Sequence, residues 1–130
     1  MNGEKNPVVE IRKTVRGASP QLPYEEIARG ILGRRYELSL VICGDPLAKR
    51  VNRAYRKKTH AANVLSFSLD AREGEMFLNA RAAAREAKRF GVPLRARLAL
   101  LFIHGCLHLK GLRHGPKMER EEARIMRRFT

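Results

Sequence analysis

The feature that most constrains this chain is the stretch HGCLHLKGLRHG at residues 104–115, which overlaps the most apolar part of the sequence. Residues 98–109, LALLFIHGCLHL, predict a buried helix, and His104 and His108 lie one turn apart on the same face of it. In an unbroken helix His114 would lie about 15 Å beyond His104. Gly111 removes this obstacle, because glycine at a helix end readily adopts the left-handed conformation that reverses the chain. The sequence therefore predicts that three imidazoles converge.

Three histidine ligands leave the fourth position of a tetrahedral zinc site open, which is the catalytic rather than the structural arrangement. We therefore expect one Zn²⁺ per chain, held by His104, His108 and His114, where it would lower the pKa of water to about 7. The alternative interpretation is that the histidines on the helix are hydrogen-bonded core residues, or that their spacing arises by chance. Cys106 lies about 200° around the helix from His104, so we expect it in the core rather than on the metal.

The same histidine spacing occurs in the metzincin proteases as HExxHxxGxxH, where the glutamate acts as the general base. Gly105 occupies the glutamate position here and offers no proton acceptor. The sequence therefore disfavours a peptide hydrolase, although it retains the metal-binding spacing.

The length of 130 residues predicts a single domain over residues 1–130. Strands are expected at residues 8–12, 36–43, 63–69 and 75–78, and helices near 20–32, from Asp45 onward, and over 80–90, 93–110 and 116–128. This order indicates the α+β class, with a mixed four-stranded sheet packed with helices around a buried central metal-binding helix. In the helix after Asp45, the register places Leu47, Val51 and Tyr55 on one face. Tyr55 could stack on a base, but this register favours packing in the core.

The chain carries 27 Lys and Arg against 13 Asp and Glu, a net charge of +14 that favours polyanionic partners. Nucleic acid is the first candidate, and an anionic membrane surface is the second. Residues 49–58, KRVNRAYRKK, hold six basic residues and no acid. We expect RNA phosphates to bind here, although a solvated helix face is the alternative interpretation. The predicted contacts are Lys49, Arg53, Arg56 and Lys57.

The compartment is predicted from three features. The sequence begins without an apolar run that could serve as a secretory signal, and residues 98–109 are too short to span a bilayer. Cys43 and Cys106 form no CxxC pair. We therefore expect a cytoplasmic protein with reduced thiols and no membrane partner.

Two motifs resemble the YbeY family of bacterial metal-dependent endoribonucleases. HGCLHLKGLRH is similar to that family's HGxLHLxGYDH, and VNRAYRKKTHAANVLSFS at residues 51–68 is similar to its LNxxYRxKxxxTxVLSFP. The likeness runs in the same order from about residue 38 to residue 126. It implies an α/β layer around the metal helix, zinc binding by the three histidines, and an arginine, Arg56, that is needed for activity. It also implies cleavage of single-stranded RNA, with roles in small-subunit rRNA maturation and ribosome quality control.

Two departures from the family pattern affect the predicted site. Leu112 and Arg113 replace the Tyr-Asp pair before the last histidine, and arginine can neither orient a ligand as a carboxylate does nor accept a proton. We expect Arg113 to face solvent and RNA. The leading hypothesis is a zinc-dependent endoribonuclease in which metal-activated water attacks an RNA phosphodiester. The alternative is a non-catalytic RNA- or ribosome-binding factor with a structural or degenerate zinc site.

Overall fold

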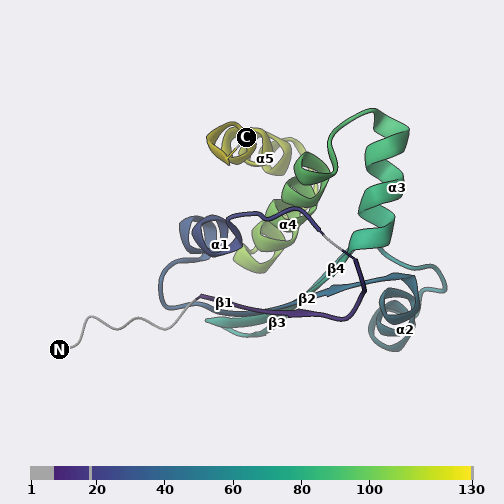
Figure 1. The fold of residues 1–130 in the computed structure, drawn as a ribbon. Coiled ribbons are helices and arrows are strands. Elements are labelled where there is room, and N and C mark those ends of the chain that lie inside the picture. The colour runs from purple at the N-terminus through teal and green to yellow at the C-terminus, as the bar shows by residue number, and fades with distance from the viewer. Residues whose placement is uncertain (1–7, 18, 130) are drawn as a thin grey trace.

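The computed structural model describes residues 8–17 and 19–129, which form one four-stranded sheet with helices on both faces (Figure 1). Strands β1 and β2 pair in parallel, β2 and β4 pair in parallel, and β4 pairs antiparallel with the edge strand β3, giving the order β1-β2-β4-β3. The predicted α+β class and mixed sheet are confirmed. The elements are β1 Val9–Lys13, α1 Tyr24–Leu32, β2 Glu37–Cys43, α2 Asp45–Arg56, β3 Val64–Asp70, β4 Glu73–Asn79, α3 Ala80–Phe90, α4 Leu94–Lys110 and α5 Pro116–Phe129.

The alternation of side chains along each strand divides the core between the two faces of the sheet. Leu40 of β2 and Met76 of β4 point to the face covered by α1 and α4, and both belong to the larger core. Val41 and Phe77, their neighbours in sequence, belong to a smaller core under α2. Figure 1 shows α2 on the opposite side of the sheet from the other helices.

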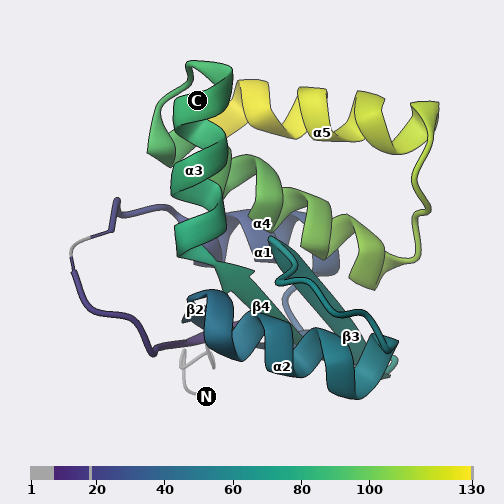
Figure 2. The same cartoon turned by 90° about the vertical axis from the view of Figure 1, so that its right-hand side faces the viewer.

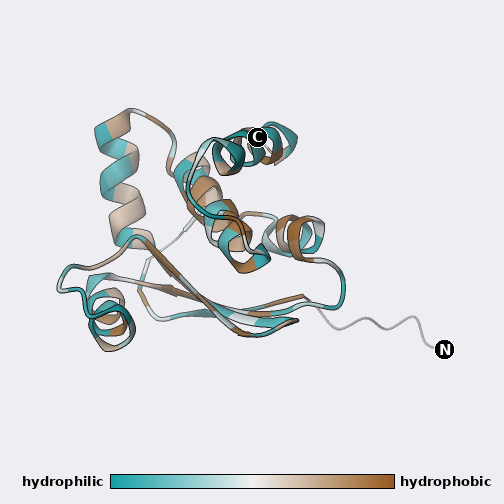
Figure 3. Ribbon diagram, turned by 180° about the vertical axis from the view of Figure 1, so that it is seen from behind, coloured by the Kyte–Doolittle hydropathy of each residue, from teal (hydrophilic) through white to brown (hydrophobic). Residues whose placement is uncertain are grey.

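Helix α4 is the centre of the larger core, as predicted. It is apolar around most of its circumference, and Phe102, Ile103 and Cys106 are fully buried. It contacts α1, α3, α5 and the strands β3 and β4. Figure 3 shows the hydrophobic colour concentrated where α4 faces α1 and the sheet. Because neighbours enclose this helix on several sides, the direction of the side chains in its last turns is fixed.

Two local predictions were wrong. Helix α1 begins at Tyr24 rather than near residue 20, because Leu22 precedes Pro23 and a residue before proline avoids the α conformation. Tyr55 does not pack in the core: Leu47 and Val51 contact the smaller core, but Tyr55 is 71% exposed. The reason is that Tyr55 lies in the last turn of α2, against β3, which is the edge strand of the sheet formed by residues 8–17 and 19–129.

Among the residues that the structure describes, no helix combines the length and the apolar character needed to cross a bilayer.

Gly74 in β4 allows α4 to lie close to the sheet. A Cβ at this position would overlap the hydroxyl of the buried Tyr36 and lie 3.0 Å from Leu109 Cδ2. We expect Gly74→Ala to lower the free energy of unfolding by about 1–3 kcal/mol, because the rigid ring has no room to move aside. Urea denaturation of both proteins measures the difference.

Gly30 in α1 provides the matched control. A Cβ there would meet no heavy atom of the described residues within 4 Å. Gly30→Ala should therefore raise the free energy of unfolding by about 0.4–1 kcal/mol, through helix propensity and a less flexible unfolded chain. Equal effects of the two substitutions would contradict the tight packing at Gly74.

Candidate metal centre

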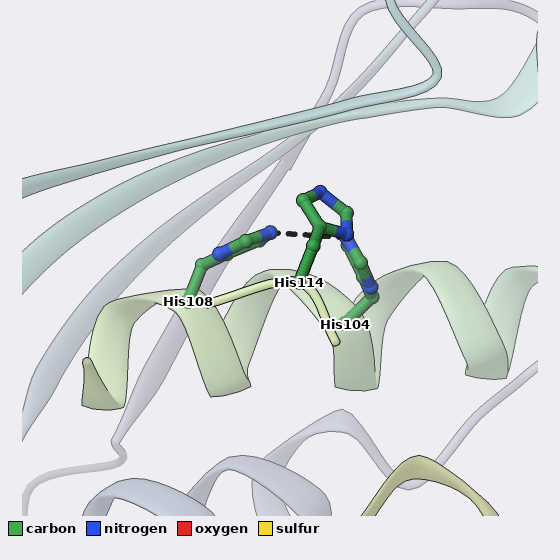
Figure 4. A group of neighbouring side chains, drawn as sticks. All are labelled: His104, His108 and His114. Atoms are coloured by element: carbon green, nitrogen blue, oxygen red, sulfur yellow. Dashed lines mark hydrogen bonds between the residues drawn. The ribbon is translucent and has the colours of Figure 1, made fainter. Parts of the chain in front are cut away.

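The reversal at Gly111 brings the three histidines together. Gly111 has φ 110° and ψ 4°, and its N–H and that of Leu112 bond back to the carbonyls of His108 and Leu107, closing the end of α4. The chain then returns alongside the helix, and the ring of His114 lies beside those of His104 and His108 (Figure 4). One nitrogen from each ring lies within 4.8 Å of the other two. These three residues could together hold a metal ion.

Two hydrogen bonds orient the histidines of α4. His108 Nδ1 donates to the carbonyl oxygen of Leu112 at 3.1 Å, and His104 Nδ1 bonds to the carboxylate of Glu122 in α5. Acceptors at both Nδ1 atoms place the protons there, which leaves both Nε2 atoms as acceptors. Those Nε2 atoms face each other at 3.0 Å. Two lone pairs so close repel unless a proton or a cation lies between them.

The donor set fits a divalent metal such as zinc. Two imidazole nitrogens on one tetrahedral zinc are about 3.3 Å apart, close to the separation of the two Nε2 atoms. His114 comes from the turn between α4 and α5 and is more exposed than the other two. Three histidine nitrogens with an open side towards solvent match the ligand set that is typical of catalytic zinc sites, whereas structural sites are closed by a fourth protein ligand.

The electrostatics of the cluster keep His108 available as a ligand. Its pKa is lowered from the ordinary value of 6.5, first because it is partly buried and then because His104 lies beside it. Glu122 is only 15% exposed, so its carboxylate contributes negative charge directly behind His104. Burial and the imidazole of His104 thus favour the neutral form of His108, which is the form that binds a metal, while the negative charge of Glu122 favours a bound cation.

The histidines form one end of a cavity of about 960 Å³ that is open to solvent. Arg56 and His60 line it from α2 and the loop that follows, and Phe67 lines it from β3. Further along, Arg97 also lines the cavity but is neutralised by Glu86 at 2.7 Å. Among the described residues, Arg56 has no ion-pair partner, so its guanidinium group remains free to bind an anion near the histidines.

The other predicted RNA contacts lie outside this cavity. Lys49, Arg53 and Lys57 are exposed on α2 and in the residue that follows it, but they do not line the cavity. Arg113 is also exposed and outside the cavity, in the turn between α4 and α5. The structure thus brings Arg56 and the three histidines together and leaves the remaining basic residues on the outer surface.

Gly105 is closely packed against the side chains of Met76 and Ser66. A Cβ there would lie 2.7 Å from Met76 Cε and 2.9 Å from Ser66 Oγ. Ser66 donates to the carbonyl of Gly105 at 3.1 Å, which ties β3 to α4 directly after the first histidine. A protease-type glutamate at this position would require Met76 and Ser66 to move aside. Cys106 is fully buried, and its pKa is raised by that burial, so it is a core thiol, as predicted from its position on the helix.

Glu122 is the site residue that the sequence analysis missed. It lies four residues after Met118 and three before Ile125, both of which are buried on the inward face of α5. An acidic residue between two inward apolar positions of an amphipathic helix was the available signal. Its partner, however, could not be identified before the packing of α5 against α4 was known.

Comparison with known proteins identifies the family. A sequence model of the family described as Endoribonuclease YbeY matches residues 5–130. The chain belongs to this family. Its relatives named Endoribonuclease YbeY include those of Aromatoleum aromaticum, 42% identical over 89 residues, and Geobacter metallireducens, 40% identical over 98 residues. The matches cover 66% and 68% of this chain but only 58% and 65% of those relatives.

A third relative and one solved structure match over more of their length. Endoribonuclease YbeY of Methylibium petroleiphilum is 32% identical over 140 residues, covering 98% of this chain and 94% of the relative. The solution structure of the Thermotoga maritima protein TM1509 is similar with a TM-score of 0.65 and 20% identity, covering 90% of this chain and 87% of that one. At this identity, the structural likeness supports the YbeY-like fold alone.

Glu122 should control the metal affinity of the site through His104. We expect Glu122→Gln to weaken zinc binding about 10- to 100-fold, because a carboxylate behind a histidine ligand fixes its tautomer and raises its basicity. Competition with a chromophoric chelator measures the affinity. Glu121→Gln is the matched control, because that neighbouring carboxylate is paired with Arg124 at 2.7 Å on the surface. Equal affinities of the two variants would contradict the role assigned to Glu122.

Zinc affinity should depend on pH in a defined direction. Because the pKa of His108 lies below 6.5, this ligand is unprotonated at neutral pH. As the pH falls through the pKa of the ring, protons compete with the metal for its nitrogen. We then expect the zinc affinity to drop by up to about tenfold per pH unit for each protonated histidine. Calorimetric titrations between about pH 5 and pH 8 test this. An affinity that stays constant over the whole range would contradict histidine ligation.

Proposed function

We propose that this chain is a zinc-dependent endoribonuclease that hydrolyses phosphodiester bonds in single-stranded RNA. The observation that carries the proposal is the convergence of three histidine nitrogens at one end of a cavity that is also lined by Arg56, an arginine without an ion-pair partner in the described part of the chain. Membership of the YbeY family supports the same reaction class. The net charge of +14 favours a polyanionic substrate.

The proposed reaction divides the work among a few side chains. His104, His108 and His114 would hold the metal, which when bound supplies a Lewis acid that lowers the pKa of water and polarises a phosphate oxygen. Glu122 and the Leu112 carbonyl hold two of these rings in the ligand-competent tautomer. Arg56 would bind a phosphate oxygen and offset the negative charge that develops in the transition state.

The substitution of the family's Tyr-Asp pair by Leu112 and Arg113 is compatible with catalysis. Leu112 orients His108 through its backbone carbonyl, which does not depend on the side chain at that position. Glu122 already supplies a carboxylate behind His104. The exposed Arg113 places its charge at the surface of the turn rather than in the cavity. These contacts favour an active site over a degenerate one.

We also propose that the substrate is rRNA of the small ribosomal subunit and that the protein acts in the cytoplasm. The motif likeness to the YbeY family supports this choice of substrate. The exposed cations of α2, including Lys49 and Arg53, and Lys57 beyond its end would contact phosphates outside the cavity. In this arrangement, the outer cations hold the RNA, and the residues of the cavity determine where it is cut.

A non-catalytic RNA- or ribosome-binding factor is the second candidate function. The observation in its favour is Arg113, which stands where the family has an acid. Such a factor would bind single-stranded RNA with metal present and leave it intact. A peptidase is disfavoured, because the closely packed Gly105 stands where the metzincins have the glutamate that peptide hydrolysis requires.

An RNA cleavage assay with matched variants tests the proposed enzyme. His108→Ala should abolish cleavage, and Arg56→Ala should lower kcat about 10²- to 10³-fold, because it removes a charge aimed at the reacting phosphate. Arg53→Ala, which lies one turn earlier and outside the cavity, should change mainly the affinity and its salt dependence. Intact RNA after incubation with metal-loaded wild-type protein would favour the non-catalytic factor. Undiminished cleavage by His108→Ala would exclude the histidine site as the catalytic centre.

A further inference from the structure

An exposed aromatic side chain lies beside the candidate site. Tyr55 is 71% exposed at the end of α2, and its ring centroid is 5.2 Å from that of Phe67 on β3. Phe67 in turn contacts Phe77, which is 9% exposed in the smaller core, at 6.2 Å. The three rings therefore run from the interior to the surface, and Tyr55 presents most of its area to solvent. An aromatic ring left so open contributes little to the core.

The position of this aromatic pair connects it to the cavity. Phe67 lines the same cavity as the three histidines, and so does Arg56, the residue that follows Tyr55. Figure 2 shows β3 next to α2, which it contacts, with α4 on the other side of the sheet. Phe67 lies on the α2 face of the edge strand, whereas Ser66 bonds to α4 on the opposite face. The cavity therefore extends around the edge strand from the histidines to Phe67, and Tyr55, which does not line it, contacts Phe67.

The surroundings of the pair determine what it can bind. Residues 49–58 hold six basic residues and no acid, so the exposed ring stands among cations. A flat apolar surface flanked by guanidinium and ammonium groups matches a nucleotide, whose base stacks while its phosphates meet the cations. A purely apolar partner would have to bury these charges without compensation.

We propose that Tyr55 and Phe67 form a stacking subsite for one nucleobase of single-stranded RNA, beside the phosphate that Arg56 binds. This inference rests on the proposed function, because it assigns a binding role for the same substrate. The open side of the Tyr55 ring stacks on the base, and Phe67 supports the ring from behind. A base in a double helix is already stacked on both sides, so the subsite selects unpaired RNA.

The chain contains no tryptophan, so Tyr55→Trp creates a single fluorescent reporter at the subsite. We expect its fluorescence to be quenched when single-stranded RNA binds in the presence of a chelator, which keeps the RNA intact. An oligomer of the same length without bases carries the same phosphates and should leave the fluorescence nearly unchanged. Equal quenching by both oligomers would overturn the stacking role.

Affinity measurements by fluorescence anisotropy complete the test. Tyr55→Ala should weaken binding of single-stranded RNA about 5- to 100-fold and abolish the preference over the oligomer without bases, while Tyr55→Phe retains both. The slope of affinity against salt should stay as in the wild type, because no phosphate contact is removed. Leu69→Ala is the matched control, since Leu69 is an exposed apolar residue, 58% exposed, on β3, the strand that carries Phe67. It should bind RNA as the wild type does.

The outcomes separate this inference from the proposed function. If wild-type protein cleaves RNA but Tyr55→Ala binds it with unchanged affinity, the stacking subsite is wrong and the endoribonuclease stands. If wild-type protein neither binds nor cleaves single-stranded RNA, both proposals are wrong. A loss of affinity in Tyr55→Ala with an unchanged urea midpoint supports the subsite, because the exposed ring then acts on the ligand and not on the fold.

Discussion

The left-handed turn at Gly111 is the constraint on which the candidate site depends. Helix α4 is enclosed by the sheet and by other helices, so the directions of His104 and His108 are set by the core. His114 can join them only if the chain reverses within a few residues of the helix end. The reversal requires a φ of 110° at residue 111, and glycine adopts this angle without the steric clash that a Cβ would cause. One glycine therefore converts a local histidine pair into a group of three.

The second constraint is the orientation of the rings. Proximity alone does not make histidines into ligands, because either nitrogen of a neutral imidazole can carry the proton. Here the acceptors at Nδ1 come from two different elements, a backbone carbonyl just after α4 and a carboxylate on α5. The fold thus commits both Nε2 atoms to the same small volume. Packing of α5 on α4 is therefore as important to the site as the histidine spacing.

Features that depend on neighbours in sequence could be predicted, and those that depend on tertiary packing could not. The histidine pair, the stop at Gly111 and the alternation of β2 are local, and so the fold class and the residues that converge followed from the sequence. The role of Glu122 could not be predicted, because its partner His104 is eighteen residues away on another helix. The burial of Tyr55 was predicted wrongly, because helical periodicity gives the direction of a side chain but not the position at which the sheet beneath it ends.

The edge strand β3 explains why the features of this site gather in one place. An edge strand has a free side, so a cavity can extend around it and be lined by residues from both faces of the sheet. On one face, Ser66 holds the strand to α4 beside the histidines, and on the other Phe67 lies beneath Tyr55. The basic residues of α2 then flank the same edge. A flexible single-stranded RNA bound there can contact the cations, the aromatic surface and the histidine cluster in succession. A rigid RNA duplex cannot bend around the edge of a β-sheet in this way.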